Sequence, residues 1–152
     1  MKLLATTISI LSITLAAHAE KEKTQIPFKS DFGNYEITGC AGQTFQLDCK
    51  LKSVSIDSVQ NAETVNFTFK SEDGKVVNNN IEVMANDKFT SEDDVSVLSV
   101  AKRKNPSNWS EESQEITLDK SDAKQWTLTF AVVRENLGKS VKRQIEYKVK
   151  KK

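Results

Sequence analysis

The feature that most constrains this chain is a two-residue alternation of apolar and polar side chains, which begins near Gly33 and recurs almost to the C-terminus. Successive side chains of a β-strand point to opposite faces of a sheet, so this period indicates strands with one buried face. In the clearest run, threonine or alanine separates the apolar residues Trp126, Leu128, Phe130 and Val132. No segment after residue 20 has a convincing helical period, and we predict an all-β protein.

The alternating segments predict about eight strands, most of them separated by short turns. Short connections without helical crossovers favour antiparallel strands. We therefore expect one all-β domain, residues 33–152, that folds as an antiparallel up-and-down β-barrel or meander; a two-sheet β-sandwich is the alternative. The expected strands lie near residues 33–40, 44–56, 65–69, 76–83, 95–100, 116–118, 126–132 and 141–149, and residues 85–94 are expected to form a polar connection.

The N-terminus has the features of a secretory signal peptide. Lys2 precedes an uncharged apolar run that ends at Ala17-His18-Ala19, a small-residue cleavage pattern, and charged residues follow from Glu20. This arrangement predicts a signal peptide over residues 1–19 and a flexible lead-in over residues 20–32. The run is short for a membrane span, and an N-terminal anchor is the alternative. We expect an exported protein, periplasmic or secreted, without a transmembrane segment in its mature chain.

The predicted mature chain is neutral, because residues 20–152 carry 21 basic and 21 acidic side chains once Lys2 is removed. Nucleic-acid-binding proteins normally show a strong excess of basic residues, so we expect no nucleic-acid partner. A domain of this length can bury a core without several disulfides. We expect a monomer.

The stretch from Gly33 to Ile56 changes phase within its second predicted strand. Its apolar residues have odd numbers up to Leu51 and even numbers from Val54 onward. A one-residue shift moves side chains to the opposite face of a sheet. We therefore expect a β-bulge or bend near Lys52-Ser53.

Cys40 and Cys49 are the only cysteines of the chain. An even number of cysteines in an exported protein predicts a disulfide, which for so short a loop contributes about 2.5–3 kcal/mol by the chain-entropy estimate. Tyr35 and Gly39 share the inner face of the first strand, which turns Cys40 to the other face. The bond therefore needs a change of phase, for which Gly39 is the best suited residue, and we expect irregular backbone over residues 39–42.

The side chains that usually carry catalysis are scarce. The only histidine, His18, lies in the predicted signal peptide, which removes Ser-His-Asp and Cys-His arrangements and the commonest zinc ligand. With both cysteines oxidised no thiolate remains, so we expect no catalytic residue, no cofactor and no metal. Asp87 and Glu92–Asp94 could offer oxygens to calcium, but we interpret them as a solvated loop. A carboxylate-pair or Ser-Lys enzyme is the alternative.

Trp109 is the best candidate for a binding residue, together with the basic residues Lys102, Arg103 and Lys104 that precede it. An amphipathic aromatic residue in an otherwise polar loop can anchor a partner. The alternative is that Trp109 folds back over the end of the barrel, because tryptophan is highly buried on average. The partner would be an unknown protein or envelope ligand.

Phe32-Gly33-Asn34-Tyr35, at the start of the first predicted strand, resembles the G-x-W opening of lipocalin-type barrels, with tyrosine in place of tryptophan. In that family an arginine near the end of the barrel packs against the aromatic residue. The resemblance implies a lipocalin-like shape in which Tyr35 and Arg143, or else Tyr35 and Arg134, form a barrel-closing pair. The C-terminal helix usual in that family has no counterpart in this sequence.

Together these features predict a small, exported, non-catalytic binding or inhibitor-type protein of the cell envelope that acts through its loops on a protein or envelope partner. The alternative is a carrier of a small apolar ligand inside the barrel, because eight strands can enclose one such ligand. Large residues in the inward phase argue instead for a filled interior: Phe45, Phe67, Phe69, Trp126 and Phe130.

Overall fold

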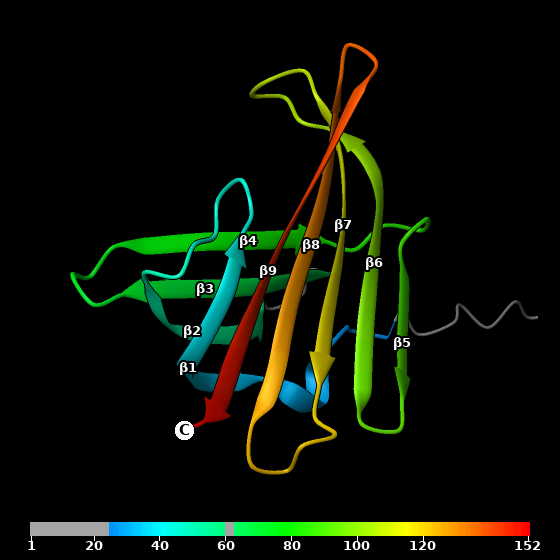
Figure 1. Ribbon diagram of the computed structural model, residues 1–152. Coiled ribbons are helices and arrows are strands. Elements are labelled where there is room, and N and C mark those ends of the chain that lie inside the picture. Colours follow the sequence, from blue (N-terminus) through cyan, green and yellow to red (C-terminus); the bar gives the residue numbers. More distant parts are fainter. Residues whose placement is uncertain (1–24, 60–62) are drawn as a thin grey trace, which may run out of the picture.

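The computed structural model describes residues 25–59 and 63–152, so the predicted signal peptide, residues 1–19, lies outside the described residues. Within these ranges nine strands form one antiparallel sheet, preceded by a turn of 3-10 helix (Figure 1). No helix in them is long and apolar enough to cross a membrane. The elements are η1 (Lys29–Asp31), β1 (Gly33–Gln43), β2 (Leu51–Ser58), β3 (Thr64–Ser71), β4 (Val76–Glu82), β5 (Lys88–Glu92), β6 (Val95–Lys104), β7 (Glu111–Asp119), β8 (Trp126–Asn136) and β9 (Lys139–Lys151).

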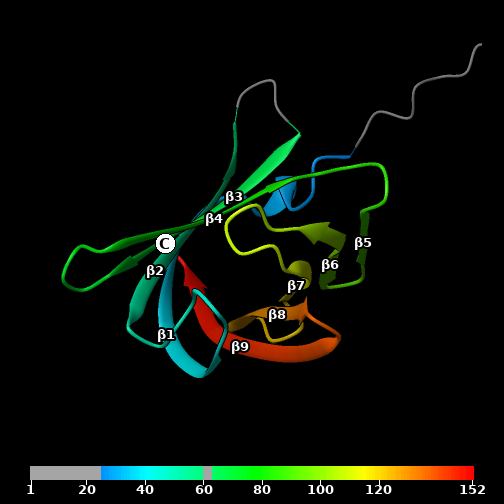
Figure 2. The ribbon, with the colours of Figure 1, turned by 90° about the horizontal axis from the view of Figure 1, so that it is seen from above.

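The sheet is an up-and-down meander that curls into a half-barrel (Figures 1 and 2). Its strand order is β4-β3-β2-β1-β9-β8-β7-β6-β5, so the first strand pairs with the last. The two free edges belong to β4 and β5, which follow each other in the sequence. Figure 1 shows β3 and β4 crossing β8 and β9 at a steep angle, so the two halves of the sheet face each other. The predicted all-β meander is therefore confirmed, with nine strands described where about eight were expected.

Residues 44–50 form a loop, although the sequence predicts a strand there. The Thr44 hydroxyl accepts hydrogen bonds from the backbone amides of residues 46 and 47 at 3.3 and 3.0 Å. Such a local bond offers the backbone an alternative to a strand ladder. The strand resumes at Leu51, and the register shift expected nearby is confirmed between Leu51 and Ser53.

Residues 88–92 form β5, although the sequence predicts a polar connection there. This strand pairs with β6 over all of its residues. Within β5 only Phe89 packs against the core, while its neighbours are exposed. A single inward apolar residue produces too little alternation to identify a strand from sequence.

Large apolar side chains fill the middle of the half-barrel. Phe67 and Phe130 meet edge to face with their ring centroids 5.1 Å apart. The Phe69 ring lies 5.6 Å from that of Phe130 and 5.5 Å from that of Tyr147. All four side chains are fully buried, and aromatic pairs of this kind stabilise a core beyond their buried area.

The segment before β1 packs against the sheet. Phe28, which falls in the predicted lead-in, is buried, and its ring centroid lies 5.7 Å from that of Phe67 and 5.2 Å from that of Phe89. Phe67 belongs to β3 and Phe89 to β5, so Phe28 connects the two halves of the sheet. The carboxylate of Asp31 binds the Lys120 ammonium group at 2.8 Å. The packed part of the chain therefore includes residues that precede the predicted boundary at residue 33.

The predicted disulfide and the change of phase before it are both confirmed. The expectation of irregular backbone over residues 39–42 is wrong, because these residues pair with β9 in unbroken register. The register of β1 against β9 shifts between Ile37 and Gly39, so Thr38 is an extra residue in β1. Beyond this bulge Cys40 packs against the core on the same side of β1 as Ile37. Cys40 and Cys49 form a disulfide with their Cα atoms 5.5 Å apart, which ties the 44–50 loop to β1.

Candidate functional site

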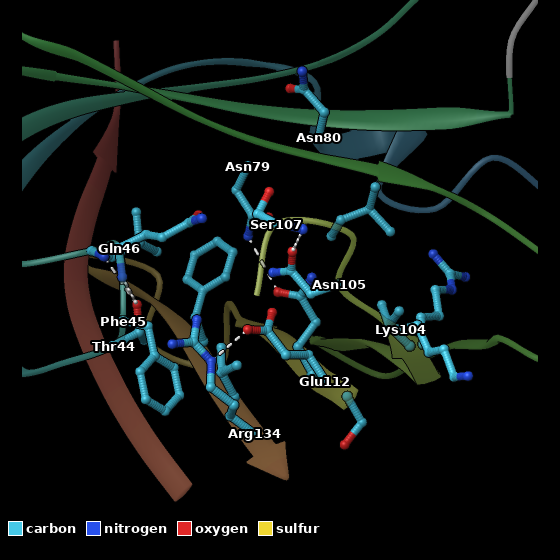
Figure 3. A pocket seen from close by; sticks show the side chains of 18 of the residues that line it. Thr44, Phe45, Gln46, Asn79, Asn80, Lys104, Asn105, Ser107, Glu112 and Arg134 are labelled. Atoms are coloured by element: carbon cyan, nitrogen blue, oxygen red, sulfur yellow. Dashed lines mark hydrogen bonds and ion pairs between the residues drawn. The ribbon is translucent and has the colours of Figure 1, made fainter. Parts of the chain in front are cut away.

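One end of the half-barrel opens into a cleft of about 320 Å³. The cleft lies on the side where the sheet does not close, between β4 and the strands β6–β8, and residues 44–47 and 104–107 border it (Figure 3). Its most buried lining residues are apolar and continue the core: Leu47, Ile81, Val100 and Phe130. Around them stand amide, guanidinium and carboxylate groups. An apolar base with a few polar groups is the usual composition of a ligand site.

Arg134 and Glu112 form an ion pair in the wall of the cleft. They are direct cross-strand partners on β8 and β7, and Arg134 Nε lies 2.6 Å from Glu112 Oε1. The Cζ atoms of Arg134 and Arg143 also lie 3.9 and 4.5 Å from the centre of the Phe45 ring, within the range of a cation–π contact. Among the described residues the terminal nitrogens of Arg134 have no hydrogen-bond partner. They are therefore available to a ligand.

An amide pair crosses the cleft from one half of the sheet to the other. Asn79 Nδ2 on β4 donates to Gln114 Oε1 on β7 at 3.2 Å, and both side chains line the cleft. A primary amide has two donor hydrogens and an acceptor oxygen, so this single bond leaves donors and acceptors on both residues. The pair therefore bridges the two halves of the sheet and keeps hydrogen-bonding capacity for a ligand.

Arg103, a predicted binding residue, joins the β4–β5 connection to β6. Its guanidinium binds the Asp87 carboxylate and donates to the Glu82 carbonyl oxygen at 2.8 Å. The Asp87 side chain is fully buried and also accepts the backbone amides of Met84 and Ala101, each at 2.8 Å. Asp87 is therefore a structural carboxylate, and the prediction of a solvated loop is wrong at this position.

Lys102 and Lys104, the other predicted basic residues, are both exposed near the end of β6.

 The register of β6 against β7 shifts between Val100 and Arg103, and Lys102 falls within this irregular part of the strand. Its ammonium group lies 2.5 Å from a carboxylate oxygen of Glu135, whose hydrogen bond raises the pKa of Lys102. Lys104 instead lines the cleft and has no ion pair among the described residues.

Trp109 projects from the loop between β6 and β7. Its side chain is 87% exposed, so it does not fold back over the end of the barrel. The loop beneath it is held by backbone hydrogen bonds, with the Asn105 amide donating to the Ser110 carbonyl at 2.7 Å and the Trp109 amide donating to the Asn105 carbonyl at 3.0 Å. Trp109 has a left-handed backbone, with φ 57°, a conformation that is costly for a bulky residue.

Leu137 is a second exposed apolar residue, and it is not among the binding residues predicted from sequence. It occupies the turn between β8 and β9, has φ 48° and is 96% exposed. Val141, on the same hairpin, is also exposed. The turn Asn136-Leu137-Gly138 could have identified Leu137 as a candidate from sequence, because a large apolar residue is unusual at a position that favours asparagine or glycine.

Tyr35 and Arg143, the predicted barrel-closing pair, are not brought together. In the β1–β9 ladder Tyr35 pairs with Lys151, whereas Arg143 lies eight residues away along the same strand and contacts Phe45. The cation beside Tyr35 is Lys151, whose Nζ lies 5.8 Å from the ring centre. The Tyr35 hydroxyl donates to the carbonyl oxygen of Asp31, and burial raises the pKa of Tyr35 to about 12.

In residues 25–59 and 63–152 no group of three acidic or cysteine side chains is arranged to hold a metal ion.

The structure places three of the predicted binding residues, Arg103, Lys104 and Trp109, on or beside the loop that borders the cleft. The cleft residues Phe45, Asn79 and Gln114 come from three separate segments, and only folding brings them together.

Comparisons with family models, curated proteins and solved structures found no match to this chain.

Proposed function

We propose that the chain is an exported, non-catalytic binding protein of the cell envelope that acts on its partner through the loops at the cleft end of the half-barrel. The observation that carries this proposal is the state of Trp109 and Leu137. They are the two most exposed large apolar residues of the described chain.

Both residues carry two costs in the free protein. Each exposes a large apolar surface to water, and each has a left-handed backbone, at φ 57° for Trp109 and φ 48° for Leu137, which costs an L-residue roughly 1–2 kcal/mol. Asparagine or glycine would avoid both costs at a loop tip. A partner that covers the two side chains would recover the cost of their exposure.

Export is supported by the disulfide between Cys40 and Cys49, because such bonds persist in oxidising compartments. A non-catalytic role is supported by the sequence, whose only histidine lies in the predicted signal peptide. The ion pair of Arg103 with Asp87 near the cleft has a structural role, since it holds the β4–β5 connection in place.

The proposal is tested by measuring the affinity of the mature protein for a partner isolated from envelope extract. Trp109→Ala and Leu137→Ala should each weaken binding at least about tenfold, because buried aromatic and aliphatic anchors dominate interfaces. Val76→Ala is the matched control, since Val76 is a half-exposed apolar residue on β4. Unchanged affinity in both tip variants would contradict the proposal.

The cleft favours a second function, the binding of a small molecule. A volume of about 320 Å³ is at the lower end of ligand sites, and the polar groups of Arg134, Asn79 and Gln114 favour an amphipathic ligand over a purely apolar one. Native mass spectrometry of protein purified from its own host would detect the ligand. Val132→Trp, which fills the cleft, should abolish that mass, whereas Val133→Trp, at the neighbouring position on β8 outside the cleft lining, should retain it.

A further inference from the structure

The end of the molecule that carries Trp109 and Leu137 is strongly basic. The two segments that form it, residues 102–112 and 133–143, hold seven basic and three acidic side chains. This excess is local, because the predicted mature chain as a whole is neutral. Four of the basic residues have no ion pair among the described residues: Lys104, Lys139, Lys142 and Arg143.

Two apolar tips extend from this basic end. Figure 1 shows the β6–β7 loop and the β8–β9 turn as the parts that reach furthest beyond the sheet there. Glu111 and Glu135 are cross-strand partners, so Trp109 and Leu137 each lie two residues beyond the same pair. Seen from above, the β6–β7 loop turns over the inside of the curled sheet, while the hairpin extends outward (Figure 2). A broad, flat partner can contact both tips at once.

We propose that this partner is the surface of a lipid bilayer with anionic headgroups; this assignment rests on the function proposed above and names the partner of the same loops. Tryptophan favours the boundary between headgroups and acyl chains, and an exposed leucine can enter the acyl region beside it. Lysine and arginine around the tips attract anionic headgroups, each by roughly fivefold in affinity near the surface.

The charge distribution favours a bilayer over an apolar groove on a protein. A groove that buried both tips would also have to accommodate Lys139 and Lys142, whose charges are costly to remove from water without partners. At an anionic surface the same lysines stay hydrated and gain favourable interactions. Two short tips provide shallow and reversible attachment, which is weakened by salt.

The experiment uses the mature protein and vesicles of phosphatidylglycerol with phosphatidylethanolamine, compared with vesicles of phosphatidylcholine. Trp109→Asn and Leu137→Asn remove the apolar tips, and asparagine adopts the left-handed backbone readily, so the fold is retained. Lys139→Glu with Lys142→Glu reverses the charge of the hairpin. The matched controls are Val76→Thr, and Lys70→Glu with Lys88→Glu, which change exposed residues away from these loops.

We expect cosedimentation with the anionic vesicles and little with phosphatidylcholine. Each tip variant and the double charge reversal should weaken binding at least about tenfold, and the controls should stay within about twofold. Trp109 is exposed while Trp126 is partly buried, so a blue shift of the fluorescence on binding should disappear in Trp109→Asn. Absence of binding, equal binding to both vesicle types or binding unaffected by the tip variants would overturn the lipid assignment.

The same variants separate this inference from the proposed function. If vesicles do not bind but an envelope protein binds with an affinity that falls in Trp109→Asn, the lipid assignment is overturned and the proposed function stands. If neither vesicles nor any envelope partner responds to the tip variants, both are overturned.

Discussion

The curled sheet is closed by backbone hydrogen bonds on one side and by side chains on the other. On the first side β1 and β9 form a ladder that runs from Tyr35 and Lys151 to Gln43 and Gln144. On the second side the edge strands β4 and β5 do not pair. Side chains connect the two halves there: Phe28 against Phe67 and Phe89, Arg103 against Asp87 and Glu82, and Asn79 against Gln114.

This difference explains where the cleft lies. A ladder holds neighbouring strands about 4.8 Å apart and leaves no room between them. Side-chain bridges hold the two halves further apart and reach across only at certain points, so open space remains beside them. The cleft lies at such a point, next to the Asn79–Gln114 bond. The candidate site is therefore a consequence of incomplete closure of the sheet.

Gly42→Ala should have the largest effect, on the side closed by the ladder. Gly42 has φ +89°, and an added Cβ would lie 2.2 Å from the backbone oxygen of Gln144 on β9. Backbone strain together with this clash should lower the free energy of unfolding by about 4 kcal/mol. Gly74, with φ +85° and open space around it, is the matched control, and Gly74→Ala should cost only about 1–2 kcal/mol. Equal losses in denaturant titrations would show that contact with β9 is not the cause.

Asp87→Ala tests the side closed by side chains. It removes the buried carboxylate that holds Arg103 and the amides of Met84 and Ala101, and we expect a loss of about 3 kcal/mol. Hydrogen exchange should accelerate around residues 82–87 and 101–103 before it does so in the β1–β9 ladder. Lys102→Ala, which removes an exposed ion pair, should cause no measurable loss. Uniform acceleration of exchange would mean that the two sides do not open independently.

Cys40→Ser combined with Cys49→Ser should lower the free energy of unfolding by about 2.5 kcal/mol, the chain-entropy value for so short a loop. The β1–β9 ladder should persist without the disulfide, because its backbone bonds do not involve the sulfur atoms. Thermal unfolding with and without a reductant measures the effect. The reductant should shift the wild-type transition and leave the double variant unchanged.

Tyr35→Phe should cost about 1 kcal/mol through loss of the hydrogen bond to the Asp31 carbonyl. Burial, with a smaller contribution from the Asp31 charge, raises the pKa of Tyr35 to about 12. The fold favours the neutral phenol, so this contribution is fully present below about pH 10, the unfolded pKa, and is lost as the pH rises toward 12. Unfolding titrations should show a shallower alkaline loss of stability in Tyr35→Phe. An identical pH dependence would contradict the assignment.

The Asn79–Gln114 bond should show the smallest effect. A double-mutant cycle with Asn79→Leu and Gln114→Leu should give a coupling energy of about 0.5–1 kcal/mol. The double variant should be close to wild type in stability, because two apolar side chains can pack across the same gap. A coupling near zero would show that this bond does not help to hold the two halves together.

The individual strands on the ladder side of the molecule could largely be inferred from sequence, although the pairing of β1 with β9 could not. Alternation predicted the strands around Tyr35 and Phe130, and parity predicted the bulge near Gly39 before the Cys40–Cys49 bond. These inferences succeed because the two-residue period and the length of a disulfide are local constraints. The two-residue period does not reveal β5, because Phe89 is the one residue of that strand that packs inward.

The side closed by side chains could not be inferred in this way. Asp87 is one of several acidic residues in its part of the sequence, and only its position beside Arg103 makes it a buried structural group. Alternation predicts a strand at Phe45, whereas the Thr44 turn places this residue in a loop beside Arg134. The polar surroundings of Trp109 indicate a binding residue, but only the tertiary structure shows that its indole is exposed and not buried.

The sequence by itself determined the all-β class, the meander of neighbouring strands and the disulfide, because each of these depends on residues close together in the chain. The tertiary structure alone decided that β1 would meet β9 while β4 and β5 remained apart, and hence where the cleft and its exposed tips would lie. The physical reason is that closure of a curled sheet depends on the twist and bulges accumulated over all of its strands. No single stretch of the sequence determines the combined effect of that twist and those bulges.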